Sequence, residues 1–321
     1  MTDYQEVLDE GRAEADRILN RMENEVHKIY RTAYSEMQVK ADEYLKNFIR
    51  EDSHLRELLN NGVITQTEYN KWRYSHMLTG KRWYEMADVL AADMTNSNLI
   101  AVNIINNHIP EVYAAGYNYG LYSVEKLALF ETSFTLYDRY TVERLIRDKP
   151  DLLPKAKIDI PKDLQWNKRK MNSAVTQGIL QGETIPEISQ RLAKVTDMNE
   201  VSAIRNARTM TTSAENGGRI DSYRNAENLG IKMSKTWIAT LDGRTRDSHR
   251  QLDGETVSDI DGVFSNGCRF PADPRGDPAE VYNCRCTLIS MPVKINIRDS
   301  SRRNNKLRNM SYDEWKNQKA R

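Results

Sequence analysis

A proline-free stretch from Glu6 to about Arg50 constrains the fold of this chain more than any other feature. Apolar or small side chains recur along it at steps that are mostly 4, 4 and 3, an average of about 3.7 residues, which is the period of an α-helix with one apolar stripe. One long helix is therefore predicted, and its stripe needs a partner, either another helix of the chain or another subunit. The stripe comprises Val7, Gly11, Ala15, Ile18, Met22, Val26, Ile29, Ala33, Met37, Ala41, Tyr44 and Phe48.

Helical periodicity continues beyond this stretch, with local signals that divide it. The Asn61-Gly62 pair predicts a turn, and Thr65 with Glu68 three residues later forms the pattern of a capping box. Pro110 is expected to interrupt the next helix, because proline lacks the backbone N–H that a helix interior uses. This part of the chain is predicted to be an elongated bundle of helices.

Composition divides the chain into four predicted segments. Residues 1–150 form the elongated α-helical domain, and three prolines between 150 and 161 mark its end. Residues 151–230 are a helical segment, which Gly217-Gly218 is expected to weaken. Residues 231–292 combine a strand at 235–240 with short segments broken by Asp-Gly and proline, and residues 293–321 form a basic tail. The predicted fold class is mostly α, with a small, compact α+β module rich in loops near the C-terminus.

The net charge of +1 conceals an uneven distribution. Residues 1–150 sum to about −6 and residues 151–321 to about +7, and the tail from Lys294 onward carries nine basic and three acidic residues. A basic arm is suited to nucleic acid or to an acidic partner, and it is equally compatible with a solvated, partly disordered tail. No apolar run is long enough to cross a bilayer, so no membrane association is expected.

The three cysteines, Cys268, Cys284 and Cys286, lie with His249 inside 38 residues of the loop-rich segment. One hypothesis is a structural zinc site of the Cys₃His type, since zinc stabilises modules that have little core. The spacing departs from the usual Cys-x₂-Cys pair. Alternatively, Cys284 and Cys286 lie on one face of a strand as small apolar side chains, with Arg285 on the other face. A redox or nucleophilic thiol is the third interpretation. Otherwise no cofactor is expected.

A second dense group of polar residues lies between Thr240 and Glu255. Asp242, Arg244, Arg246 and His249 could perform acid-base chemistry on a nucleic-acid phosphate, as a nuclease requires. The competing interpretation is that the arginines pair with nearby aspartates and tie loops together. The chain has no Gly-rich phosphate loop, no His-Glu-x-x-His motif and no nucleophile elbow, so the structural interpretation and a non-enzymatic role are favoured.

Four motifs occur in a specific order in the second half of the chain. These are "ARTMTTSAEN" at 207–216, "KTWIATLDGRTRDSHRQLDG" at 235–254, "FPADPRGDP" at 270–278 and "NCRC" at 283–286. Over about residues 165–290 the chain therefore resembles the Mu F-like phage head morphogenesis family, the minor head (minor capsid) proteins of tailed bacteriophages. Some members carry an appended toxin or enzyme domain, and only 35 residues follow Cys286 here.

The resemblance implies a structural component of the virion that lies inside the head and is assembled in the host cytoplasm. Its expected partners are the portal protein, capsid or scaffold proteins and double-stranded DNA, and its expected role is in procapsid assembly and in DNA packaging or ejection. A zinc-stabilised DNA-binding module remains an alternative to a purely structural protein. The residues expected to contact DNA are Arg244, Arg246, Arg302, Arg303, Lys306 and Arg308.

Overall fold

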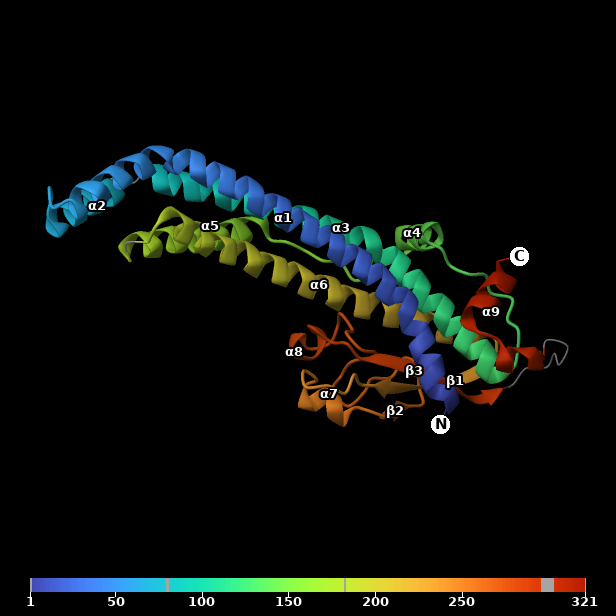
Figure 1. The fold of residues 1–321 in the computed structure, drawn as a ribbon. Coiled ribbons are helices and arrows are strands. Elements are labelled where there is room, and N and C mark those ends of the chain that lie inside the picture. Colours follow the sequence, from blue (N-terminus) through green and yellow to red (C-terminus); the bar gives the residue numbers. More distant parts are fainter. Residues whose placement is uncertain (1, 79–80, 182, 296–302, 321) are drawn as a thin grey trace. The chain divides into compact units, whose positions relative to one another are not determined.

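The computed structural model describes residues 2–78, 81–181, 183–295 and 303–320 (Figure 1). It is mostly helical, with one small antiparallel sheet near the C-terminus, so the predicted fold class is confirmed. The longer helices are α1 (Thr2–Asn60), α2 (Gln66–Leu78), α3 (Lys81–Ala128), α4 (Arg139–Asp148), α5 (Ile160–Leu180), α6 (Ile185–Asn228) and α9 (Tyr312–Lys319). The shorter elements are β1 (Ile231–Ile238), α7 (Asp247–Gln251), β2 (Thr256–Val257), α8 (Pro278–Val281), β3 (Thr287–Ile295) and the 3₁₀ helix η2 (Asn305–Asn309).

The chain divides into two compact units, and each is built from separate stretches of sequence. The sheet unit comprises Met1–Glu23, Ile104–Ala156 and Ile204–Arg321, and the helical unit comprises Asn24–Asn103 and Lys157–Ala203. Helices α1, α3 and α6 contribute residues to both. The four segments predicted from composition stay a prediction.

Helix α1 confirms the long N-terminal helix, and it continues ten residues beyond the predicted end at Arg50. The side chains of Ala15, Ile18, Met22, Val26, Ala33, Met37 and Ala41 are all buried, as the stripe predicts. Position 29 was predicted wrongly, because Tyr30 is buried in its place, four residues after Val26 and three before Ala33. The side chains at positions 7, 11, 44 and 48 lie outside the described residues.

Tyr30 belongs to a buried polar network inside the helical unit. Its hydroxyl donates to Asn98 Oδ1 over 2.6 Å, and burial raises its pKa. Asn98 Nδ2 donates in turn to Asp163 and to Asn199 Oδ1, and Asn199 Nδ2 donates to Asn167 Oδ1 at 3.0 Å. Because buried amides are stable only when partnered, this network fixes the register of α1, α3, α5 and α6 within the unit.

Pro110 does not interrupt α3, contrary to the prediction. Ile109 and Pro110 are both buried, and Val112 and Tyr113 in the next turn are buried as well. Burial of apolar side chains on both sides of the proline offsets the missing backbone hydrogen bond.

Gly217 and Gly218 do not weaken α6, which runs without a break from Ile185 to Asn228. Within the sheet unit this part of α6 packs closely on α3. A Cβ at Gly218 would lie 2.3 Å from Tyr113 O, and one at Gly116 would lie 2.2 Å from Glu215 O. The glycines are therefore needed for backbone contact between two helices, and they do not act as breakers.

The C-terminal half of α6 lies between α3 and the sheet (Figure 1). The core there joins Val124 of α3 and Tyr223 of α6 to Met233 of β1 and Leu288 of β3. The strand order is β2-β1-β3, and all pairs are antiparallel. The strand predicted at 235–240 is therefore correct in type and begins four residues earlier, at Ile231.

Lys235 ties the loops of the module to β1. Its side chain is completely buried, and Nζ donates to the carbonyls of Ile260, Gly262 and Arg269 at 2.6, 2.6 and 2.8 Å. Burial lowers its pKa to about 8. A single ammonium group thus organises a stretch that has few regular elements.

The basic tail is largely folded from residue 303 to residue 320, so the solvated interpretation is wrong for these residues. Trp315 is buried against Tyr122 of α3, and its Nε1 donates to Glu125 Oε2 over 2.7 Å. Lys319 pairs with the other oxygen of Glu125 at 2.7 Å, and Lys316 pairs with Glu14. Two cationic side chains of the tail therefore form ion pairs within the protein. No helix within the described ranges is both long and apolar enough to span a bilayer.

Candidate functional site

The "NCRC" segment lies along one face of α6. Asn283 N donates to Thr209 Oγ1 at 3.0 Å, and Thr212 Oγ1 donates to Cys284 O at 2.9 Å. One turn further on, Asn216 Nδ2 lies 3.3 Å from Cys286 O. Residues 209, 212 and 216 share a helix face because they follow steps of 3 and 4. The first and last motifs of the family resemblance are thus in direct contact.

Cys284 and Cys286 precede β3, which begins at Thr287, so their predicted position on a strand is wrong. The chain leaves α8 through Asn283, which has a φ of 58°. This left-handed conformation is one that asparagine tolerates better than most residues. The side-chain contacts of helix α6 hold the segment in place of a strand ladder.

Arg285 joins the "NCRC" segment to Asp242 of the second motif. Its guanidinium makes a bidentate ion pair with Asp242, at 2.5 and 2.6 Å, and Thr240 Oγ1 donates to its carbonyl at 2.6 Å. The hydrogen bonds from Arg285 and from the Arg244 backbone lower the pKa of Asp242 well below its usual range. The second motif is thereby joined to the fourth.

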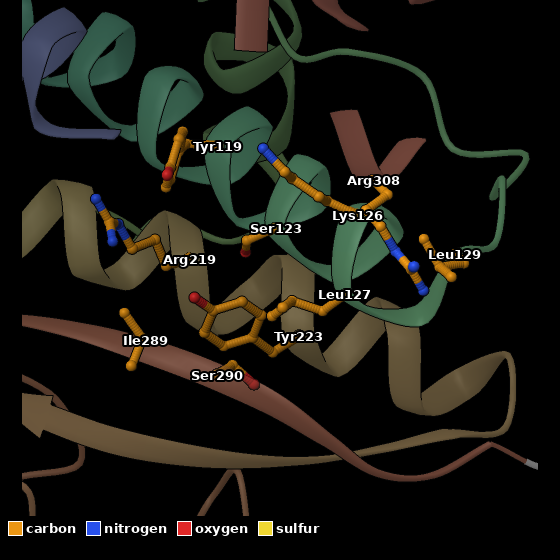
Figure 2. Close-up of a pocket in the computed structure, with 10 residues that line it drawn as sticks. All are labelled: Tyr119, Ser123, Lys126, Leu127, Leu129, Arg219, Tyr223, Ile289, Ser290 and Arg308. Carbon is orange, nitrogen blue, oxygen red and sulfur yellow. The ribbon is translucent and has the colours of Figure 1, made fainter. Parts of the chain in front are cut away.

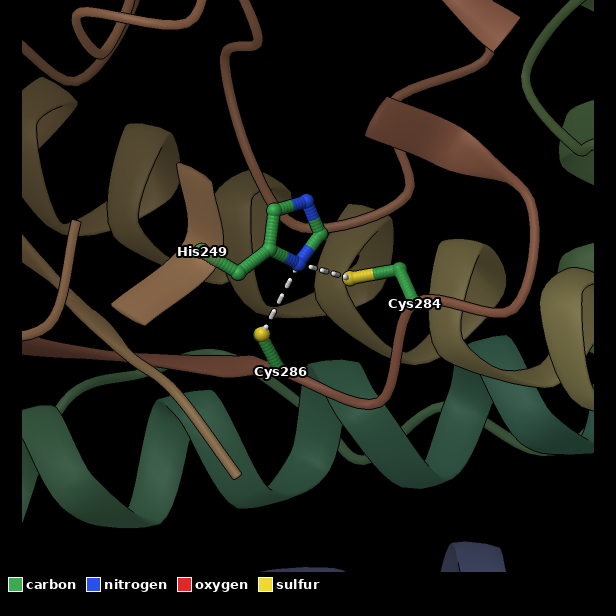
Figure 3. Close-up of side chains that lie close together, drawn as sticks. All are labelled: His249, Cys284 and Cys286. Atoms are coloured by element: carbon green, nitrogen blue, oxygen red, sulfur yellow. Dashed lines mark hydrogen bonds between the residues drawn. The ribbon is translucent and has the colours of Figure 1, made fainter. Parts of the chain in front are cut away.

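His249, Cys284 and Cys286 meet inside the module, and all three are buried (Figure 3). His249 Nδ1 lies 3.4 Å from Cys286 Sγ and 3.8 Å from Cys284 Sγ. The Cys284 thiol next to Cys286 lowers the pKa of Cys286, and the imidazole adds to this effect. The same sulfur–sulfur hydrogen bond, together with burial, raises the pKa of Cys284.

Glu280 of α8 lies on the other side of the His249 ring. Its Oε2 is 3.0 Å from His249 Nε2, although the ring N–H is not aligned well enough for a hydrogen bond. Ser248 Oγ and Asn266 Nδ2 both donate to the Glu280 carboxylate, at 3.1 and 3.2 Å. Trp237 packs edge-on against the imidazole at 5.4 Å between ring centroids. The ring therefore has a fixed orientation, with Nδ1 toward the sulfurs.

Cys268, the fourth predicted ligand, is not part of this group. The ligand atoms of the other three lie within 4.8 Å of one another, and Cys268 is not among them. It is buried in the same apolar cluster, where burial raises the pKa of its thiol to about 11. A Cβ at Gly276 would lie 2.5 Å from its sulfur, which indicates tight packing around the thiol.

The predicted DNA contacts are dispersed in the structure. Arg246 donates to the carbonyls of Glu280 and Tyr282, so its guanidinium is used within the protein. Arg244 is exposed. Arg303, Lys306 and Arg308 are also exposed, on the folded C-terminal segment, and Arg302 lies outside the described residues.

A cavity of about 180 Å³ lies elsewhere in the sheet unit (Figure 2). Its lining includes three cationic side chains and two aromatic ones, Lys126, Arg219, Arg308, Tyr119 and Tyr223. Arg219 already pairs with Glu215 at 2.6 Å and donates to Leu288 O. Among the predicted functional residues that the structure describes, Arg308 alone lines this cavity.

Sequence reasoning missed Glu280 and the three α6 side chains that hold the "NCRC" backbone. Nothing in the residue types marks Glu280, because an acidic residue in the first turn of a helix is explained by the helix dipole alone. Thr209, Thr212 and Asn216 carried a usable signal, since they lie at steps of 3 and 4 within the "ARTMTTSAEN" motif and therefore share one face of α6.

Comparisons with known proteins support the family resemblance. Residues 169–289 match the model of the family described as Phage Mu protein F like protein, which confirms the resemblance seen in the sequence. The minor head protein GP7 of Bacillus phage SPP1 is 23% identical over 316 residues, which cover 95% of this chain and 94% of that protein. The "NAD(+)--arginine ADP-ribosyltransferase EFV" of Enterococcus faecalis is 27% identical over 308 residues, which cover 92% of this chain and 60% of that protein. This chain therefore matches less than two thirds of the latter relative's length. No solved structure is significantly similar.

Proposed function

We propose, from the match of residues 169–289 to the Phage Mu protein F like family, that this protein is a minor head protein, a structural component of a tailed-phage virion. The observation that carries the proposal is the alignment with the SPP1 minor head protein, which extends over nearly the whole of both chains. A shared minor head function is the simplest reason for a likeness of that extent.

Enzymatic activity is not part of this proposal. The transferase named among the relatives is matched over only 60% of its length, so its activity is not transferred to this chain. The nuclease alternative needs Asp242 and Arg246 to face a substrate. Asp242 is instead paired with Arg285, and Arg246 with backbone carbonyls of the 280–282 segment. These contacts support a role for the second motif in folding.

The proposed partners are the portal protein and the capsid or scaffold proteins of the same phage, met in the host cytoplasm during procapsid assembly. The test is to co-express the full-length chain with the tagged portal protein and to purify the tagged complex by size exclusion. We expect the chain to co-elute with the portal, and a tail protein of the same phage serves as the control bait. If the chain co-purifies with none of the portal, scaffold and capsid proteins, this part of the proposal is excluded.

Double-stranded DNA inside the head is the third proposed partner. The proposed contacts are Arg244, Arg302, Arg303, Lys306 and Arg308, and Arg246 is set aside because its guanidinium donates to backbone carbonyls of the protein. Counterion release makes log affinity fall with log salt by about 0.9 per phosphate contact. Replacing Arg303, Lys306 and Arg308 with alanine should therefore reduce the slope by about 2.7.

A matched control separates a specific contact from a general effect of charge. Lys28, Arg31 and Lys46 are exposed cations of α1, and their replacement with alanine removes the same charge. We expect this control variant to change the slope of log affinity against log salt by less than about 0.9, the contribution of one phosphate contact. An unchanged slope in the C-terminal variant, or equal changes in both variants, would exclude the C-terminal segment as the DNA contact.

A further inference from the structure

The ligand atoms of His249, Cys284 and Cys286 have the spacing of a tetrahedral zinc site. With Zn–S at about 2.3 Å and Zn–N at about 2.05 Å, a tetrahedral angle places N and S about 3.6 Å apart. His249 Nδ1 lies 3.4 and 3.8 Å from the two sulfurs, and all three atoms fall within 4.8 Å of one another. No rearrangement of the backbone is needed to bring the ligands to one point.

The environment of His249 favours the tautomer that binds a metal through Nδ1. Glu280 Oε2 lies 3.0 Å from Nε2, and its negative charge there favours the proton on that nitrogen although the two atoms are not aligned for a hydrogen bond, which leaves the Nδ1 lone pair directed at the sulfurs. Histidine ligands of metals are commonly oriented by a carboxylate in this way. Ser248 and Asn266 hold the carboxylate in turn.

The charge balance of the site also fits a divalent cation of soft character. Zinc binding deprotonates both thiols, and the two thiolate charges that result would be costly to bury without compensation. A zinc ion neutralises both, and the combination of two sulfur ligands with an imidazole selects zinc over calcium or magnesium.

We propose that His249 Nδ1, Cys284 Sγ and Cys286 Sγ bind one zinc ion, with water at the fourth tetrahedral position. Cys268 is not a ligand. The ion joins α7 to the segment that precedes β3, and the hydrogen bonds from Thr212 and Asn216 attach that segment to α6. The ion thus connects two segments of a module with few regular elements, and the proposal does not depend on the minor head function.

The direct test is the metal content of the full-length protein. The chain is produced with zinc in the medium, purified without chelators and analysed by inductively coupled plasma mass spectrometry. We expect about one zinc per chain in the wild type. Cys284→Ser, Cys286→Ser and His249→Ala should each lose it, and Cys268→Ser, the matched control, should keep it. A wild-type protein with less than half an equivalent, or equal loss in the control, would overturn the proposal.

Two measurements on the wild type keep the proposal falsifiable when a ligand variant does not fold. X-ray absorption at the zinc edge should find two sulfur and two nitrogen or oxygen neighbours, and three sulfurs would make Cys268 a ligand and refute the assignment. Mass mapping of protein purified without reductant should find free Cys284 and Cys286. A disulfide between them in metal-free protein would replace the zinc site with a redox pair.

Glu280 supplies a positioning test that leaves all three ligands intact. Removing the carboxylate charge with Glu280→Gln should weaken zinc binding by about 10- to 100-fold. Glu255→Gln is the control, because Glu255 is an exposed-loop carboxylate that bonds to Ser265. Affinity is measured by competition with a chromophoric chelator. Equal affinities in the two variants would show that Glu280 does not orient the histidine.

Discussion

Two adjacent glycines of α6 are expected to respond in opposite directions to alanine. A Cβ at Gly218 would lie 2.3 Å from Tyr113 O and 2.7 Å from Tyr117 N, which are backbone atoms of α3. A Cβ at Gly217 would meet nothing closer than the ring of Tyr113 at 3.8 Å, which is an ordinary contact. Both positions lie inside the same helix, so they gain equally in backbone entropy and differ only in packing.

The magnitudes follow from these two terms. Alanine in place of glycine in a helix interior stabilises by about 0.5–1 kcal/mol, so Gly217→Ala should raise the free energy of unfolding by that amount. Overpacking costs about 1–3 kcal/mol, and the Gly218 clash is with backbone that cannot rotate away. With a packing cost at the upper end of this range, about 3 kcal/mol, the net effect of Gly218→Ala is a loss of about 2 kcal/mol, and the two variants should differ by that packing cost of about 3 kcal/mol.

Urea unfolding followed by far-ultraviolet circular dichroism measures this difference. The midpoint of Gly217→Ala should rise and that of Gly218→Ala should fall, without a change in the slope of the transition. Gly116→Ala should behave like Gly218→Ala, because its Cβ would lie 2.2 Å from Glu215 O. Midpoints that move together, or stabilities that agree within about 0.5 kcal/mol, would refute the close helix contact.

Three further predictions concern the packing of α9, the buried Lys235 and the ion pair between Asp242 and Arg285. Trp315→Ala should destabilise the packing of α9 on α3 by about 3–5 kcal/mol. Limited proteolysis should then cleave the chain after residue 303 earlier than in the wild type, and unchanged resistance to the protease would contradict this packing. Lys235→Met leaves one buried and two partly buried carbonyls without their donor and should lower the free energy of unfolding in urea by about 1–3 kcal/mol, whereas a wild-type midpoint would show that the ammonium is dispensable. Asp242 has a folded pKa below its ordinary 3.8, so its stabilising effect is present above that pH and is lost as pH falls through the folded value. The stability difference between wild type and Asp242→Asn should therefore shrink in acid, and a difference that is independent of pH would exclude the ion pair with Arg285.

The sequence was sufficient for the helices whose burial follows a simple period. The stripe of α1 is correct at seven of the positions whose side chains are described, and the capping box at Thr65 forms, with Glu68 Oε2 accepting from Thr65 N. Local signals failed where tertiary packing overrides them. Pro110 lies inside α3, and Gly218 lies inside α6, because the contact between these two helices stabilises more than the local preference costs.

The candidate site was predicted in part. His249, Cys284 and Cys286 were selected by residue type, whereas the strand expected to alternate Arg285 with the two cysteines is absent at these positions. Which thiol stays out of the group could not be predicted, since Cys268 differs from the others only in its position in the folded module. Likewise, composition left a solvated tail and a partner-binding arm equally open, whereas Leu307, Tyr312 and Trp315 pack in one cluster with tyrosines of α3.

The most direct test of the minor head function is the composition of purified virions. DNA-filled heads of the phage that encodes the chain are isolated by density gradient, treated with protease before or after the heads are opened, and analysed by quantitative mass spectrometry. The chain should be present in intact heads, resist protease until they are opened, and then be digested. Its absence from DNA-filled heads, or its digestion in intact ones, would contradict a minor head protein inside the virion.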